Sequence, residues 1–155
     1  MATKTSKRTG ETSTTVSVGI RIDPKIKFAL DIMGRLQKRS LTAVIEWSIS
    51  QAIEQQPADQ VGTSLSSMLD KIWSTDESIK LVMLALHLPQ ALTYDELRVW
   101  ETIKVSSCFW RKYPDGSFDS SADRLDFDAV RAGWSDLMRH VDLYKASITI
   151  TPLDS

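Results

Sequence analysis

This chain of 155 residues has one cysteine, six glycines and five prolines. A single cysteine cannot form an intramolecular disulfide, and it excludes a metal site built from clustered cysteines. No apolar run approaches the roughly 20 residues that cross a bilayer, and the polar start of the chain has no signal-peptide core. The composition therefore predicts a protein of the reducing cytoplasm, with no membrane partner.

Motifs of catalysis and metal binding are also lacking, since we find no G-x-S-x-G turn, no P-loop and no H-E-x-x-H. His87 and His140 are isolated, and Cys108 is expected to be a buried, inert thiol. Residues 115–126 carry oxygen side chains at five EF-hand positions, but Ser120 replaces the required glycine and the last position is aspartate instead of glutamate. We therefore expect a polar loop there, and no enzyme activity, metal or cofactor.

An excess of charge of either sign is missing too, because the formal net charge is −1. The charges are unevenly distributed. Residues 1–56 hold nine lysines and arginines against five acidic residues, a net charge of +4, and the remainder holds ten against fifteen, a net charge of −5. Such asymmetry indicates a basic interaction module attached to an acidic body. The predicted parts are a flexible basic arm (1–14), a basic domain (15–56), a linker (57–63) and an acidic C-terminal domain (64–155).

The basic domain begins with a segment of strict alternation. In residues 16–22 every even position is β-branched and apolar, and every odd position is small or charged. A period of two over seven residues predicts a half-buried strand. Asp23 and Pro24 then predict a helix start, because aspartate caps helices well and proline suits the first turn. Apolar residues at helical spacing follow as far as Leu36.

A second helix is predicted after a short basic turn. Ser40 is a good N-cap for the apolar-periodic stretch that follows, which ends before Pro57. One strand cannot form a sheet, and about 45 residues are too few for a secure core. If two chains pair their strands antiparallel, the apolar side of the ribbon can cover four helices. The expected dimer core is Val16, Val18, Ile20, Ile22, Leu30, Val44 and Ile45.

Residues 12–56, about a third of the chain, resemble the ribbon-helix-helix (MetJ/Arc-type) DNA-binding family. The resemblance rests on the order of basic arm, alternating strand, Asp-Pro helix start, basic turn and Ser-capped second helix. Many members have glycine in the turn, where this chain has Lys38 and Arg39. The resemblance implies an N-terminal ribbon-helix-helix with base contacts from the outward strand residues Ser17, Gly19 and Arg21. Together with the helical pattern of the C-terminal part, it makes the expected fold mainly α-helical.

The same resemblance implies a phosphate at the start of the second helix. A capped helix N-terminus is a ready anion site, because its amides and its dipole both favour negative charge. Independently of the family, Arg21 can donate two hydrogen bonds to guanine O6 and N7 in the major groove, which a two-stranded ribbon can enter. The expected phosphate contacts are Ser40, Leu41, Thr42, Lys38, Arg39, Lys4, Lys7 and Arg8.

The acidic part is predicted to be helical, with a core rich in tryptophan. Thr93 followed by Glu96 forms a capping box, and Asp126 is the N-cap of the last helix. The inward side chains expected on these elements are apolar or aromatic and line one side of each helix. They include Trp73, Leu97, Trp100, Ile103, either Phe109 or Trp110, and Trp134, Leu137 and Met138.

These features favour a homodimeric, sequence-specific double-stranded DNA-binding protein, a bacterial or mobile-element transcription repressor of the cytoplasm that associates with the nucleoid. An antitoxin, or a plasmid partition or relaxosome accessory protein, is an alternative within DNA binding. A dimeric protein-interaction adaptor without DNA binding is an alternative of another class. The C-terminal domain could join dimers into higher oligomers, or bind a protein or a small ligand.

Overall fold

The computed structural model describes residues 15–154 and confirms that this part of the chain is mainly helical. It contains six α-helices, three short 3-10 helices and no sheet within residues 15–154. The contacts divide the chain into two compact units, and the division falls within α2, after Ser48. The predicted domain boundary lies further along the chain and stays a prediction.

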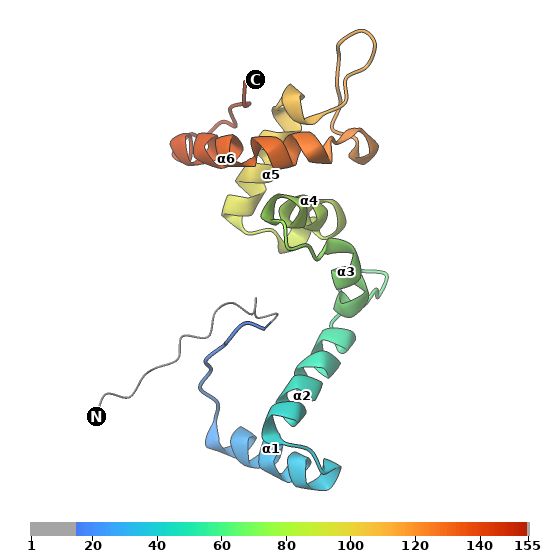
Figure 1. The fold of residues 1–155 in the computed structure, drawn as a ribbon, viewed down its shortest axis with the longest axis vertical. Coiled ribbons are helices and arrows are strands. Elements are labelled where there is room, and N and C mark those ends of the chain that lie inside the picture. Colours follow the sequence, from blue (N-terminus) through green and yellow to red (C-terminus); the bar gives the residue numbers. More distant parts are fainter. Residues whose placement is uncertain (1–14, 155) are drawn as a thin grey trace, which may run out of the picture. The chain divides into compact units, whose positions relative to one another are not determined.

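The first unit contains α1 (Pro24–Gln37), drawn in blue in Figure 1. The carboxylate of Asp23 accepts a hydrogen bond from the amide of Lys25 at 2.7 Å, and Pro24 stands at the first helical position, as the sequence predicted. The helix ends at Lys38, which adopts the left-handed conformation with φ of 53°. A lysine therefore makes the turn for which many ribbon-helix-helix proteins use glycine.

Helix α2 (Leu41–Gln55) follows directly, and Ser40 caps it as predicted. The Ser40 hydroxyl accepts a hydrogen bond from the Ala43 amide at 3.2 Å. The helix stops before Pro57, because proline disfavours helical geometry in the residue that precedes it.

Gly34 is the point of closest approach between α1 and the start of α2. A Cβ atom at this position would lie 3.0 Å from the Arg39 carbonyl oxygen and 3.7 Å from a methyl group of Val44. Both Gly34 and Val44 are buried. The glycine therefore lets the turn fold back against α1, a packing role that the sequence pattern did not predict.

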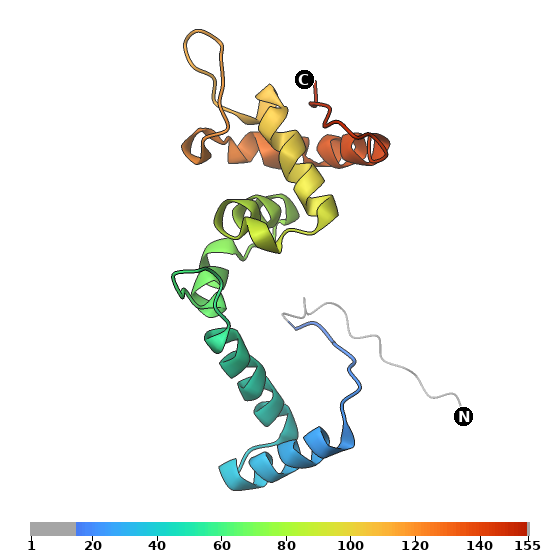
Figure 2. The same ribbon diagram turned by 180° about the vertical axis from the view of Figure 1, so that it is seen from behind.

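The second unit is built from four helices around one main apolar core. Helix α4 contacts α3, α5 and α6, and α5 crosses α6 (Figures 1 and 2). Buried side chains from α4, α5 and α6 form the core, together with Phe109, Trp110 and Leu125 from the connections between helices. The helices are α3 (Leu65–Ile72), α4 (Glu77–His87), α5 (Tyr94–Val105) and α6 (Phe127–Leu143).

Two predicted helix starts in this unit are confirmed. Thr93 and Glu96 form the complete capping box of α5: the Thr93 hydroxyl accepts from the Glu96 amide, and the Glu96 carboxylate accepts from the Thr93 amide. The Asp126 carboxylate accepts from two amides in the first turn of α6, at 3.0 and 3.1 Å. These caps depend on neighbouring residues only, so the sequence specifies them fully.

Three of the predicted inward side chains lie at the surface instead. Trp73, which follows the last residue of α3 and has an extended backbone, is 69% exposed. Leu97 and Met138 are also exposed. The buried face of α5 is formed by Val99, Trp100 and Ile103, and Leu97 falls outside it. On α6 the core side is centred on Val130 and Leu137, and Met138 lies off it.

The segment after α6 is tied back to α5 and to the end of α6. Arg98, which is buried, donates to the carbonyl oxygens of Tyr144 at 2.9 Å and Ser147 at 3.2 Å. The buried Ser106 hydroxyl accepts a hydrogen bond from the Leu153 amide at 2.8 Å. A guanidinium at a helix C-terminus also meets the negative end of the helix dipole. These contacts fix the course of the chain as far as Leu153.

Within residues 15–154, no helix combines the length and the apolar character needed to cross a membrane.

Candidate nucleic-acid interface

The alternating segment is fully accessible in the single chain. Residues 15–23 form neither helix nor strand in the described structure. Val16, Val18 and Ile20 are 88%, 77% and 66% exposed, and Ile22, next to the helix start, is 38% exposed. An apolar row of this kind has no partner within its own chain. The predicted strand is therefore not formed within residues 15–154, which contain no second strand to pair with it.

The three residues predicted to contact bases lie in the same accessible segment. Ser17, Gly19 and Arg21 are all exposed. A Cβ atom at Gly19 would meet nothing within 4 Å, so no contact within the chain requires glycine there. Their alternation with the apolar side chains gives the segment two chemically distinct sides if it is extended.

The apolar surface continues along α1. Ile26, Phe28 and Leu36 are exposed, and Ile32 is exposed to a smaller extent. Of the residues predicted for the dimer core, Val44 is fully buried within the single chain. Leu30 and Ile45 are half-buried, and the four strand positions are exposed. The single chain thus buries only part of the apolar surface of its first unit.

A shallow hollow of about 300 Å³ lies where α1 ends and α2 begins. It brings together Lys38, Arg39 and Leu41, three of the predicted phosphate contacts, and adds Arg35 from the last turn of α1. Asp31 also lines the hollow, but its carboxylate is paired with Lys27 at 2.7 Å. The first amides of a helix have no acceptor within the helix, so those of Leu41 and Thr42 are placed to bind an anion. Gly34 and Leu30 complete the lining.

Arg35 is the one cation of this hollow that the sequence interpretation left unassigned. It stands in the last turn of α1, three residues before Lys38, and is therefore close in sequence to the predicted basic turn. That spacing was the available signal. Of the other predicted phosphate contacts, Ser40 and Thr42 do not line the hollow, and Lys4, Lys7 and Arg8 lie outside the described residues.

No metal site is found in the second unit. Among residues 15–154, no group of three or more histidine, cysteine or acidic side chains is arranged to hold a metal ion. In the loop that has EF-hand-like spacing, the Asp115 carboxylate accepts hydrogen bonds from the amide and the hydroxyl of Ser117, at 2.9 and 2.6 Å. These contacts are those of a polar turn.

Asp119, in the same loop, is the most strongly perturbed carboxyl group. Hydrogen bonds from the Ser121 side chain, from the Tyr113 hydroxyl at 2.6 Å and from the Ser121 amide lower the pKa of Asp119 to about 2. The carboxylate in turn raises the pKa of Tyr113. Donors that hold the charged form of a carboxyl group favour its ionisation.

We expect Ser121→Ala to raise the pKa of Asp119 towards the ordinary aspartate value, because it removes the largest contribution to the shift. The pKa of the folded loop lies below that of the unfolded chain. The ionised Asp119 carboxylate therefore stabilises the folded loop at pH values above the ordinary aspartate pKa. This stabilisation is lost as the pH falls towards about 2. The ¹³C chemical shift of the Asp119 carboxyl, followed against pH, measures this. Ser120→Ala is the matched control, and an unchanged pKa in Ser121→Ala would contradict the assignment.

Comparisons of this chain with protein-family models, with curated proteins and with solved structures return no match.

Proposed function

We propose that this protein is a homodimeric, sequence-specific double-stranded DNA-binding protein that acts as a transcription regulator. In this proposal residues 16–22 of two chains pair as an antiparallel ribbon and enter the major groove. The observation that carries it is the alternating segment: its apolar side is exposed in the single chain, and its other side carries Ser17, Gly19 and Arg21. In a protein that stays monomeric, this apolar side would remain exposed to water.

Pairing with a second copy removes the exposed apolar surface. If Val16, Val18 and Ile20 packed against the exposed apolar face of α1 in the dimer, several large side chains on both surfaces would be removed from water. Each contributes about 1.5–3 kcal/mol when fully buried. The backbone groups of the segment would also gain the partners that a lone extended chain lacks within itself. A second copy satisfies both needs at once, because its segment is identical and antiparallel pairing is symmetric.

The polar side of the ribbon then faces the base edges. Each chain contributes one Arg21, whose guanidinium can bind guanine O6 and N7 with about 1–3 kcal/mol of discrimination. Gly19 allows the ribbon to approach the bases closely, and Ser17 can donate or accept. The hollow with Arg35, Lys38 and Arg39 at the start of α2 supplies the phosphate contact that orients the ribbon.

Duplex binding tests the proposal directly. A labelled duplex that carries the gene's own upstream region is titrated with protein at several salt concentrations. We expect log K to fall linearly with log salt, with a slope of about −0.9 for each phosphate neutralised. Absence of binding at low salt would contradict DNA binding and favour the adaptor alternative, in which the ribbon serves only to dimerise.

Arg21→Ala tests the role of the base contact. We expect it to weaken binding to the specific duplex by about 5- to 150-fold for each lost contact, while binding to an unrelated duplex changes little. Arg111→Ala, which removes an exposed arginine from the second unit, is the control. An equal loss on both duplexes would mean that Arg21 contacts phosphate only.

A further inference from the structure

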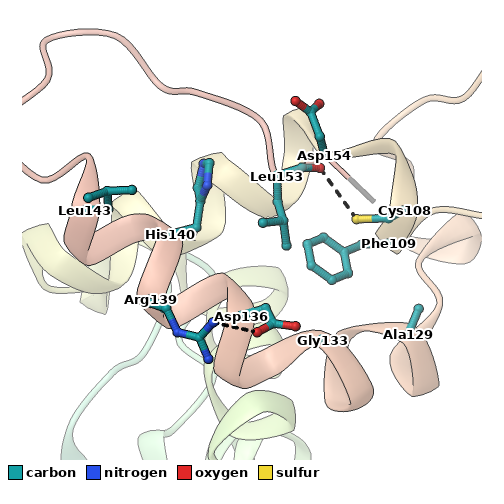
Figure 3. A pocket seen from close by; sticks show the side chains of 10 residues that line it. All are labelled: Cys108, Phe109, Ala129, Gly133, Asp136, Arg139, His140, Leu143, Leu153 and Asp154. Carbon is teal, nitrogen blue, oxygen red and sulfur yellow. Dashed lines mark hydrogen bonds and ion pairs between the residues drawn. The ribbon is translucent and has the colours of Figure 1, made fainter.

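The second unit contains a cavity of about 520 Å³ that the proposed DNA-binding function does not use. It lies between α6, the short connection at Cys108 and Phe109, and the C-terminal residues Leu153 and Asp154 (Figure 3). Clefts of roughly 300–1,000 Å³ are the size class that holds small molecules. All of its walls belong to one compact unit.

The walls of the cavity are held in place by specific contacts. A Cβ atom on Gly133 would lie 3.0 Å from the Phe109 ring, so glycine allows the ring to pack directly against α6. Opposite this ring, the amide of Leu153 donates to the Ser106 hydroxyl. The carbonyl oxygen of Thr151 lies 2.8 Å from His140 Nε2 and accepts its hydrogen bond. The cavity is therefore built into the folded unit.

The interior and the rim of the cavity differ in chemistry. The exposed Leu143 and the half-buried Leu153 give it apolar surface, whereas the Phe109 ring that also lines it is almost fully buried. On the rim, Asp136 and Arg139 lie one helical turn apart and pair at 3.3 Å, with most of each side chain exposed. Figure 3 shows this pair beside the Phe109 ring, with Asp154 on the far side of Leu153.

This pairing of opposite charges selects among ligands. Arginine has five N–H donors, and the contact with Asp136 occupies one nitrogen, so Arg139 keeps donors for a ligand carboxylate. The oxygens of Asp136 can accept from a ligand ammonium in the same way. A ligand with a single negative charge would also face Asp136, and one with a single positive charge would also face Arg139. A molecule that carries both charges next to each other can turn its ammonium towards Asp136 and Asp154, which also lines the cavity, and its carboxylate towards Arg139.

We propose that this cavity binds a zwitterionic small molecule with an apolar body, of the free α-amino acid class. The ligand carboxylate contacts Arg139, its ammonium contacts Asp136, and its side chain packs against Leu143 and Leu153. The site is independent of the proposed DNA-binding function.

Cys108 supplies a specific readout, because it lines the cavity and is the only cysteine of the sequence. Burial raises the pKa of the Cys108 thiol, so labelling with a disulfide reagent is measured at mildly alkaline pH. The probes are L-phenylalanine, phenethylamine and 3-phenylpropionate, which share a ring and differ in their charges. L-leucine and L-tryptophan extend the size range. We expect a zwitterion to slow the labelling of the full-length protein, and the matched amine and acid to bind at least about tenfold more weakly.

Two variants test which side chain binds each charged group of the ligand. We expect Arg139→Ala and Asp136→Asn each to weaken protection by the zwitterion about tenfold or more. Both side chains are largely exposed, so neither substitution is expected to unfold the unit. Arg131→Ala, on the same helix but outside the cavity, is the control and should leave protection unchanged. The proposal is overturned if none of the three amino acids protects Cys108 at about 10 mM, if the amine or the acid protects equally well, or if the variants bind like the wild type.

Discussion

A chain in which Val18 and Ile20 are both replaced by aspartate is expected to sediment as a monomer and to lose duplex affinity by more than about 100-fold. In the proposed dimer each replacement exchanges a buried apolar side chain for a carboxylate with no partner. The lost burial costs about 1.5–3 kcal/mol per side chain, and burial of an unpaired charge costs more. Because the ribbon contains two copies of each position, the free-energy cost of each replacement applies twice in the dimer.

The same substitution should cost the single chain little. Val18 and Ile20 are 77% and 66% exposed there, so aspartate would remain in water. Sedimentation equilibrium measures the loss of the dimer, and circular dichroism tests that the helices persist. Val61 and Ile148 are the matched control, since both are almost fully exposed apolar residues of the second unit. Replacing those two with aspartate should preserve the dimer. A wild-type chain that is itself a folded monomer would contradict the shared core.

The helix starts were predictable because each depends on a few adjacent residues. The Asp23 cap, the Thr93–Glu96 capping box and the Asp126 cap are all formed by contacts within four positions in the chain. Such contacts need no knowledge of the fold. The phases of the helices were harder to predict. Leu97 and Met138 stand at positions compatible with helical periodicity, but the crossing of α5 and α6 covers a narrower stripe than the apolar pattern suggests.

Features that depend on how segments of the chain fold against one another were not visible in the sequence. Gly34 is required by the approach of the Arg39 carbonyl oxygen, a consequence of how the turn folds back. The C-terminal cavity is lined by α6, by the connection at Cys108 and by Leu153, which are separated by up to 45 positions. The ribbon is the opposite case. Its pattern is local and clear, but the pairing that would make it a strand lies between two chains, so it stays a prediction.

The antitoxin alternative depends on the second unit. Ribbon-helix-helix antitoxins often carry short tails that fold on the toxin, as the resemblance implies, whereas this unit has a buried core of its own from Leu81 to Leu137. A segment with that much buried apolar surface can offset its ordering entropy without a partner. We therefore expect this unit to stay folded in isolation, and a C-terminal part that is disordered alone would favour the antitoxin alternative.

Leu137→Ala is expected to destabilise this second unit by about 2–5 kcal/mol. Leu137 is fully buried on α6 and belongs to the main core cluster, so its removal leaves a cavity as well as losing apolar burial. Urea unfolding followed by tryptophan fluorescence reports on this unit, because four of the five tryptophans lie in it. Met138→Ala is the matched control: it is the next residue, it is exposed, and it should cost well under half as much.

The same variant separates the two units functionally. Every residue assigned to the DNA interface precedes Ser48, and the core around Leu137 begins at Leu81. Under conditions in which Leu137→Ala is still folded, we therefore expect duplex affinity to be unchanged. When heating unfolds the second unit of this variant, the helices of the first unit and its dimer should persist, which circular dichroism and crosslinking can follow. Loss of dimer and duplex binding in the same transition would mean that the ribbon-helix-helix unit requires the acidic domain in order to fold.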